Sequence, residues 1–206
     1  MSRLTVSRFS SLRGKWGACV GIALVVISFA LFSEAHVRYE RQDFFFTEPW
    51  RLLTAHLTHL SALHLLFNLV GLVLICELLW HEMPVRHGLA VMLVASGVID
   101  LLLWRWHPEV LWYVGSSGVL HALWAACVTF TLSHERSLGE AKYRLAALVG
   151  GALLFVKLTL ERMDILFSAV APDDFLVIDV VHVYGALTGV GYVLIWRQVQ
   201  RVGRRK

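Results

Sequence analysis

The stretch HLSALHLLFNLVGLVLICELL, residues 59–79, decides the fold because it combines an apolar run of membrane length with polar side chains. About 20 consecutive apolar residues cross the hydrocarbon core of a bilayer as a helix. Histidine and asparagine at that depth are costly, so they usually mark a partner or a site. At 100° per residue, His64 and Asn68 share one face of this helix, one turn apart. The stretch predicts a membrane helix that presents polar groups to a protein interior.

The rest of the chain has the same apolar character. Of its 206 residues, 57% are hydrophobic and 17% are charged, whereas about a quarter of a soluble domain is charged. This composition excludes a disordered chain and argues against a water-soluble globule. Apolar runs of membrane length span residues 16–32, 54–79, 88–104, 114–132, 145–160 and 175–196. We therefore expect an all-α membrane protein, a bundle of six transmembrane helices that forms a single domain over residues 1–206.

Basic residues predict the orientation, since loops rich in Lys and Arg stay in the cytoplasm. Thirteen of them fall in both terminal segments and in loops two and four, against five in loops one, three and five. Both termini should be cytoplasmic, with residues 1–15 and 197–206 as basic segments. The net charge of +4 thus indicates orientation in the lipid bilayer rather than binding of nucleic acid. Loop five, expected outside, is acidic, with Glu161, Asp164, Asp173 and Asp174.

Three groups of polar and small residues are expected at one depth. They are His64 with Asn68 on the second helix, Gly115-Ser116-Ser117-Gly118 at the start of the fourth, and His182 with Gly185 and Gly189 on the sixth. All three helices enter from the outer face, and a rise of 1.5 Å per residue places the groups within roughly 5–15 Å of the outer boundary. Polar groups from distant parts of the chain therefore converge on one layer.

These residue types supply the parts needed for acyl transfer. A serine hydroxyl such as that of Ser117 needs a base to take its proton, and histidine, here His182, is the usual base. The oxyanion that forms needs preorganised donors, which Asn, His and the free N–H groups of a helix N-terminus provide. No spacing of Cys and His typical of zinc occurs, so we expect neither a metal nor a cofactor.

Each feature alone has a plainer explanation. A Gly-x-Ser-Gly at a helix end is more often packing, and a single His182 is more often a hydrogen-bonded interior residue. The pair Gly185 and Gly189 most often serves close helix packing, which is compatible with catalysis. Two alternatives remain. One is a haem or metal protein that uses His56, His59, His64 and His182, and the other is a proton-coupled transporter that uses Asp100, Glu77 and Lys157. Common depth and complementary chemistry together favour the catalytic interpretation.

The same residues resemble a known family, the rhomboid intramembrane serine proteases. Trp50-Arg51 followed by His59, His64 and Asn68 resembles their first loop and second helix. Gly115-Ser116-Ser117-Gly118 is similar to their Gly-x-Ser-Gly nucleophile motif, and the stretch HVYGALTG, residues 182–189, to their His-x-x-Gly-x-x-x-Gly. The resemblance extends from about residue 50 to residue 189, and order and spacing agree.

The resemblance implies a role for each residue. A Ser117–His182 dyad would act without a required acid, and His64, Asn68 and the backbone N–H of Ser117 would form the oxyanion hole. The supporting residues would be His59 in the water-accessible pocket, Trp50 and Arg51 in the first loop, Gly115 and Gly118 beside the nucleophile, and Gly185 and Gly189 where the sixth helix meets the fourth. Substrates would be transmembrane proteins, cut at the periplasmic or extracellular side of a bacterial inner membrane.

Two features depart from the usual family pattern. His121, one turn after Ser117, stands where rhomboids often have a tyrosine that stacks on the catalytic histidine. It can stack likewise or compete as base, and we favour His182 as the base. The short first loop and minimal set of helices resemble the rhombosortase branch, which implies exported substrates with a GlyGly-CTERM tag: a Gly-Gly motif, an apolar helix and a basic end. A general rhomboid protease and a non-proteolytic module that binds membrane proteins are the alternatives.

Overall fold

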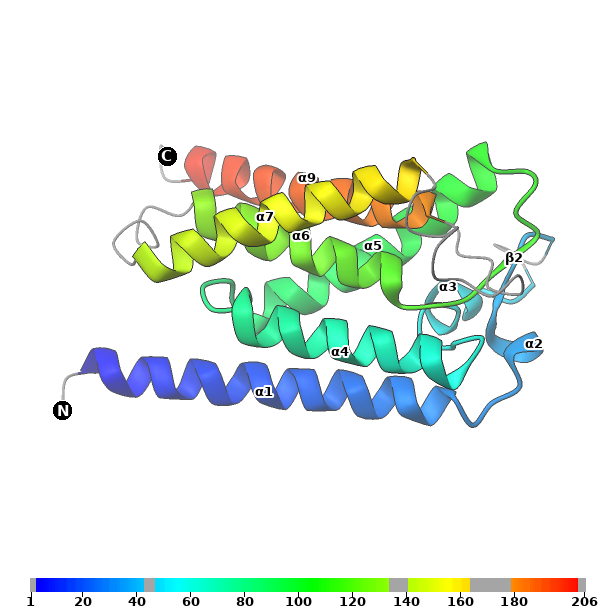
Figure 1. The fold of residues 1–206 in the computed structure, drawn as a ribbon, viewed down its shortest axis with the longest axis horizontal. Coiled ribbons are helices and arrows are strands. Elements are labelled where there is room, and N and C mark those ends of the chain that lie inside the picture. The colour runs from blue at the N-terminus through cyan, green and yellow to red at the C-terminus, as the bar shows by residue number, and fades with distance from the viewer. Residues whose placement is uncertain (1–2, 43–46, 134–140, 164–178, 204–206) are drawn as a thin grey trace.

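The computed structural model describes residues 3–42, 47–133, 141–163 and 179–203, and these are mainly helical (Figure 1). The helices are α1 (Arg3–Phe29), α2 (Glu34–Val37), α3 (Arg51–Thr54), α4 (Ala62–Leu78), α5 (Val85–Trp106), α6 (Ser117–Ser133), α7 (Ala141–Arg162) and α9 (Val180–Gly203). Two short strands, β1 (Tyr39–Glu40) and β2 (Trp112–Tyr113), pair antiparallel. The prediction of an all-helical protein is confirmed.

The long helices run side by side, with α6 inside the bundle. Helix α6 packs against α4, α5, α7 and α9, and most of its side chains are buried. The start of α1 and the end of α9 lie at the same end of the bundle, while α2, α3 and β2 lie at the other (Figure 1). The first residues of α4, α6 and α9 and the last residues of α7 therefore meet near the end that carries the short elements.

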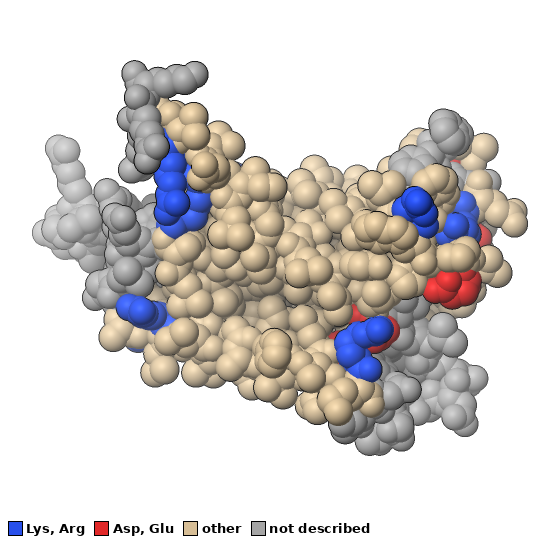
Figure 2. Space-filling model, turned by 90° about the horizontal axis from the view of Figure 1, so that it is seen from above, with Lys and Arg blue, Asp and Glu red and all other residues tan. Residues whose placement is uncertain are grey.

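The helices have the length and composition of membrane segments. Helices α5, α7 and α9 are long and apolar enough to cross a bilayer, and residues Gly14–Phe29, α4 and α6 form shorter apolar helices. In Figure 2, the described charged side chains on the visible face gather toward the two ends and leave between them a band without Lys, Arg, Asp or Glu. Large apolar side chains of α4, α5, α7 and α9 are exposed. Apolar side chains exposed over such a band are what lipid contact requires, which agrees with the predicted membrane protein.

The second predicted helix begins later than expected. We expected one helix over residues 54–79, but the chain forms the short α3, an irregular segment and then α4 from Ala62. Ser61 is the N-cap of α4, and its Oγ accepts the backbone N–H of His64 at 3.1 Å. A capping serine favours a helix start at this point. His59 therefore precedes α4 rather than lying on it.

Helix α7 is longer than expected. The predicted span ended at residue 160, but α7 continues to Arg162, so Glu161 lies on the helix rather than in loop five. Asp164, Asp173 and Asp174 fall outside the described residues, as does the start predicted for the sixth span at residue 175.

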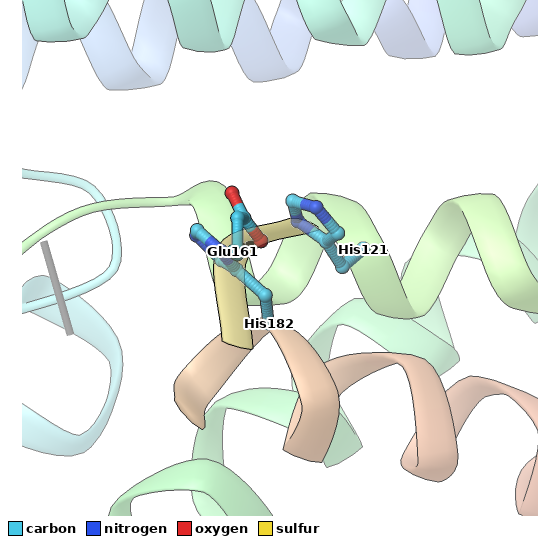
Figure 3. Close-up of side chains that lie close together, drawn as sticks. All are labelled: His121, Glu161 and His182. Carbon is cyan, nitrogen blue, oxygen red and sulfur yellow. Dashed lines mark hydrogen bonds and ion pairs between the residues drawn. The ribbon is translucent and has the colours of Figure 1, made fainter. Parts of the chain in front are cut away.

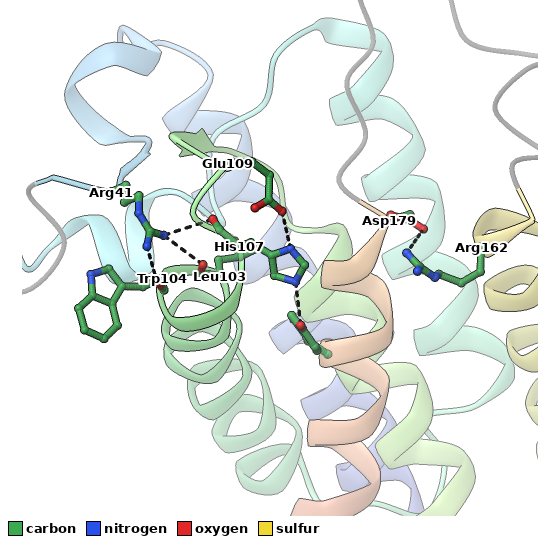
Figure 4. A network of polar contacts seen from close by, with 8 residues as sticks. Arg41, Leu103, Trp104, His107, Glu109, Arg162 and Asp179 are labelled. Carbon is green, nitrogen blue, oxygen red and sulfur yellow. Dashed lines mark hydrogen bonds and ion pairs between the residues drawn. The ribbon is translucent and has the colours of Figure 1, made fainter.

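Two arginines hold the first loop in place by donating to backbone carbonyls. Arg51 binds carbonyls within the loop, and Arg41 joins the loop to the end of α5. The Arg51 guanidinium is buried and donates to the carbonyls of Ala35 at 3.0 Å and Arg38 at 2.8 Å. Arg41 donates to three carbonyls at the end of α5, those of Leu103, Trp104 and His107 (Figure 4). Carbonyls at a helix C-terminus lack partners in their own helix, so a guanidinium there stabilises both elements. Trp50, by contrast, is half exposed.

Candidate active site

Glycines allow α6 and α9 to approach closely. A Cβ on Gly185 would lie 1.9 Å from the carbonyl oxygen of Gly118, and one on Gly189 would lie 2.1 Å from that of Ala122. A Cβ on Gly118 would lie 3.0 Å from the backbone oxygen of Val181. Side chains at these positions would push the helices apart, so small residues are required for this contact. The first turns of the two helices are thereby brought side by side.

This contact places Ser117 beside His182. Ser117 is the first residue of α6, and its Oγ lies 2.9 Å from Nε2 of His182 near the start of α9. The imidazole is 4% exposed. The hydroxyl can donate its proton to Nε2, which is the arrangement that turns an alcohol into a nucleophile. The two residues that the sequence singled out as nucleophile and base are in direct contact.

Glu161 occupies the other side of the imidazole. Its Oε2 lies 2.9 Å from Nδ1 of His182, and its Oε1 pairs with Nζ of Lys157, one turn earlier on α7. A carboxylate only accepts, so Nδ1 carries the proton and Nε2 keeps its lone pair for Ser117. From the sequence we expected Glu161 in loop five and a dyad without a required acid. The i, i+4 spacing of Lys157 and Glu161 at the end of an apolar run is the signal that could have indicated it.

His121 stacks on His182 rather than contacting the serine hydroxyl. The two rings are nearly parallel, 17° apart with centroids separated by 4.2 Å. Nδ1 of His121 lies 2.7 Å from the backbone carbonyl oxygen of Ser117 and therefore donates to it. Figure 3 shows His121, Glu161 and His182 reaching toward one another from α6, α7 and α9. The ring of His121 thus holds the imidazole of His182 from its face.

The same three residues could in principle offer ligands to a metal. One ligand atom each from His121, Glu161 and His182 lies within 4.8 Å of the others. A metal lies in the plane of each imidazole that binds it, and stacked parallel rings do not share such a point. Both oxygens of Glu161 are also engaged, by Lys157 and His182. The geometry suits a hydrogen-bonded relay better than coordination.

Gly115 shapes the approach to Ser117. Its φ of +127° is a conformation that residues with a side chain rarely adopt. A Cβ there would also lie 2.7 Å from Cε1 of His64. The N–H of Gly115 donates to the carbonyl of Ala55 at 2.9 Å, and the hydroxyl of Tyr113 donates to the carbonyl of Gly115 at 2.6 Å. The turn before α6 is therefore held against the segment that precedes α4.

A cavity of about 700 Å³ contains the groups predicted for the oxyanion hole. His64 and Asn68 of α4 line it together with Ser117 and His182. Nδ2 of Asn68 donates to the backbone carbonyl of His64 at 2.9 Å. The structure thus brings both residues to the compartment that holds the Ser117 hydroxyl.

The cavity continues from these polar groups along an apolar trough. Exposed side chains of α4 and α7 line it, so it is reachable from the lipid-facing surface. They are Phe67, Leu74, Leu78, Leu145, Val149 and Leu153. Its composition suits an apolar segment with a polar group at one end.

His59 supports the site from the side. Its Nε2 lies 3.1 Å from Oγ of Ser116, and its ring packs edge-on against His64 with centroids 4.9 Å apart. Burial, with a smaller contribution from His64, lowers the pKa of His59 to about 4. His59 is therefore neutral near pH 7, and it contacts Ser116 and His64 beside the cavity.

Two further carboxylates, those of Asp100 and Asp179, have partners other than the His182 ring. Asp100 is fully buried, and its Oδ1 lies 3.1 Å from Nε2 of His56. Asp179 pairs through its carboxylate with Arg162 at 3.0 Å, as Figure 4 shows. Among the residues that the structure describes, it is Glu161 whose carboxylate contacts the His182 ring.

These features define an integral membrane protein that holds a serine and a histidine in hydrogen-bond contact inside its helical bundle. The family model for the Rhomboid domain matches residues 47–199 of the sequence, and this range includes every residue named above for the site. The chain belongs to the rhomboid family, whose members are generally intramembrane serine proteases. No curated protein matches the chain in sequence.

Proposed function

We propose that this protein is an intramembrane serine protease in which Ser117 is the nucleophile and His182 the general base. The observation that carries the proposal is the 2.9 Å contact between Ser117 Oγ and His182 Nε2, from residues 65 positions apart. Membership of the rhomboid family agrees with it. A serine–histidine contact at the polar end of a largely apolar cavity has the components of acyl transfer.

The reaction begins when His182 takes the proton of Ser117 as Oγ attacks the scissile carbonyl carbon. The carbonyl electron pair moves onto oxygen, and the tetrahedral intermediate collapses as His182 gives the proton to the leaving amine. Water, activated by the same imidazole, then attacks the acyl-enzyme and releases Ser117. An amine in place of water would give transpeptidation by the same steps.

The oxyanion is held by the side chains of Asn68 and His64 and by the backbone N–H of Ser117. Ser117 begins α6, so its N–H has no partner within the helix and the positive end of the helix dipole points at the developing charge. Such preorganised donors in a site of low dielectric supply much of the rate enhancement of acyl transfer.

The substrate is a transmembrane segment that reaches the site along the trough between α4 and α7. Its helix must unwind near the outer face, because helical amides are bonded internally and their carbonyls are shielded. Small residues such as glycine reduce the cost of unwinding. A Gly-Gly motif followed by an apolar helix and a basic end, the GlyGly-CTERM tag of rhombosortase substrates, fits these requirements.

In this proposal the chain spans the membrane six times with both termini in the cytoplasm. The start of α1 and the end of α9 share one end of the bundle, which supports the arrangement (Figure 1). The excess of basic residues in the terminal segments places that end on the cytoplasmic side. The Ser117 end then opens to the periplasmic side of a bacterial inner membrane.

Co-expression with exported proteins tests the function. One candidate substrate carries a GlyGly-CTERM tag, and a second has a single transmembrane helix without the tag. Wild type should create a new C-terminus near the outer membrane face of the tagged protein, detected by mass spectrometry. Ser117→Ala should abolish cleavage without loss of folded protein, because the nucleophile is lost.

The matched control is Ser96→Ala on α5, whose hydroxyl donates to the carbonyl of Met92 at 3.0 Å and should not be needed. Cleavage that persists in Ser117→Ala would remove Ser117 as nucleophile. Equal cleavage of the untagged protein would favour a general rhomboid protease.

A further inference from the structure

Glu161 has a buried position that the serine–histidine pair alone does not explain. Its side chain is 6% exposed, whereas that of its partner Lys157 is 34% exposed. An i, i+4 ion pair on a helix surface needs no burial and contributes little. Here the carboxylate turns inward and divides its oxygens between Lys157 and the Nδ1–H of His182.

The neighbouring ion pair provides a comparison within the same two helices. Arg162 also links α7 to α9, through Asp179 at 3.0 Å, but its side chain is 60% exposed and does not contact the imidazole. The end of α7 thus makes one exposed link to α9 and one buried link to the His182 ring. The exposed Arg162–Asp179 pair would be enough to hold the helices together. The buried contact between Glu161 and His182 therefore has a more specific role.

We propose that Glu161 is a positioning residue that completes a Ser117–His182–Glu161 relay, with Lys157 as the counterion of its carboxylate. The inference rests on the proposed function of the serine–histidine pair. It differs from the dyad implied by the family resemblance, because an acid from α7 takes part.

The carboxylate acts on His182 in two ways. It accepts the Nδ1–H, which keeps the Nε2 lone pair directed at Ser117 through each proton transfer. It also offsets the positive charge that the imidazole gains when it removes the serine proton. His121 fixes the face of the ring and Glu161 fixes its edge, so the two contacts together define one orientation.

Lys157 explains why the carboxylate can remain charged inside the bundle. A buried carboxylate is costly unless it is paired and hydrogen-bonded. Lys157 lies one turn before Glu161 and lines the cavity, where its ammonium group contacts Oε1. The carboxylate thus keeps its second oxygen available for His182.

The test is steady-state cleavage of the tagged substrate by purified full-length variants. Glu161→Gln should lower kcat by about 10²-fold or more, since loss of the acid from a serine–histidine–acid triad costs about 10⁴-fold. KM should change little, because Glu161 contacts the base. Glu161→Asp keeps the charge and should recover part of kcat. Arg162→Gln removes the neighbouring α7–α9 link and should retain wild-type kcat.

An unchanged kcat in Glu161→Gln, or an equal loss in Arg162→Gln, would overturn the relay. If Glu161→Gln does not fold, Glu161→Asp decides, because its shorter reach should still lower kcat at constant KM and an unchanged kcat would refute the inference. Wild-type activity that depends on Ser117 but not on Glu161 would remove only the relay. Activity that survives in Ser117→Ala would remove the proposed function itself.

Discussion

At the scale of single residues, the backbone conformation of Gly115 determines where Ser117 and the His64 ring lie. Its φ of +127° turns the chain into α6 at Ser117, and its missing Cβ leaves room for the His64 ring. A residue other than glycine in such a conformation costs on the order of 1–3 kcal/mol. The placement of Ser117 relative to the His64 ring therefore depends on this glycine.

We predict that Gly115→Ala lowers kcat/KM at least tenfold and also lowers thermal stability, because the new Cβ strains the turn and displaces His64. Cleavage assays and thermal unfolding of the purified variant measure both effects. Gly97→Ala on α5 is the control, since a Cβ at Gly97 meets nothing within 4 Å. Full activity in Gly115→Ala would show that the position of His64 does not matter.

Asn68 provides a more direct test of the oxyanion hole. Loss of one donor typically costs about 10²–10³ in kcat, so Asn68→Ala should show a loss of this size with intact folding. Single-turnover cleavage separates this effect from substrate binding. An unchanged rate would exclude Asn68 from the oxyanion hole. The hydrogen bonds to the oxyanion would then come from His64 and the backbone N–H of Ser117.

How far the sequence predicts the site differs from residue to residue. Ser117 and His182 could be singled out because their chemistry is complementary and their expected depths agree. Glu161 could not, because an acid in a predicted loop is ordinarily a solvated group. Its inward orientation depends on how α7 packs on α6 and α9, which local periodicity does not encode.

At the scale of elements, the site depends on the contact between α6 and α9. Their backbones approach so closely that a Cβ at Gly189 would overlap the carbonyl of Ala122. We predict that Gly189→Ala destabilises the protein by about 1–3 kcal/mol, the usual cost of overpacking, and lowers activity by separating Ser117 from His182. Gly191→Ala on the same helix meets nothing within 4 Å and is the matched control.

Unfolding in mixed micelles measures the stability of both glycine variants. Equal stability of Gly189→Ala and Gly191→Ala would contradict the close packing of α6 and α9. The spacing of Gly185 and Gly189 predicted close helix packing, and the family resemblance implied that the partner is the helix that begins at Ser117. The sequence did not predict the break before α4, because an apolar run is continuous through residues 54–79 whereas the Ser61 cap acts through local hydrogen bonding.

At the scale of the whole molecule, the end of the bundle that holds Ser117 should face away from the cytoplasm. Glu109 lies beyond α5 on the side of β2, and Gly203 is the last residue of α9 at the opposite end. The three native cysteines, Cys19, Cys76 and Cys127, are buried. Background labelling by a maleimide that does not cross membranes should therefore be low.

We predict that Glu109→Cys is labelled in intact bacterial cells, after the outer membrane is opened if there is one, and that Gly203→Cys is labelled only once the plasma membrane is permeabilised. The basic terminal segments cause this orientation. The reverse pattern would place Ser117 on the cytoplasmic side and would contradict cleavage at the outer face.

The most direct measurement is covalent labelling of the purified protein with a fluorophosphonate, followed by mass spectrometry of its peptides. Such a probe forms a stable bond with a serine whose proton is removed by a neighbouring base. The account predicts an adduct on Ser117 in wild type and none in His182→Ala or Ser117→Ala. An unmodified Ser117 in folded wild-type protein, or an adduct that forms equally well without His182, would contradict it.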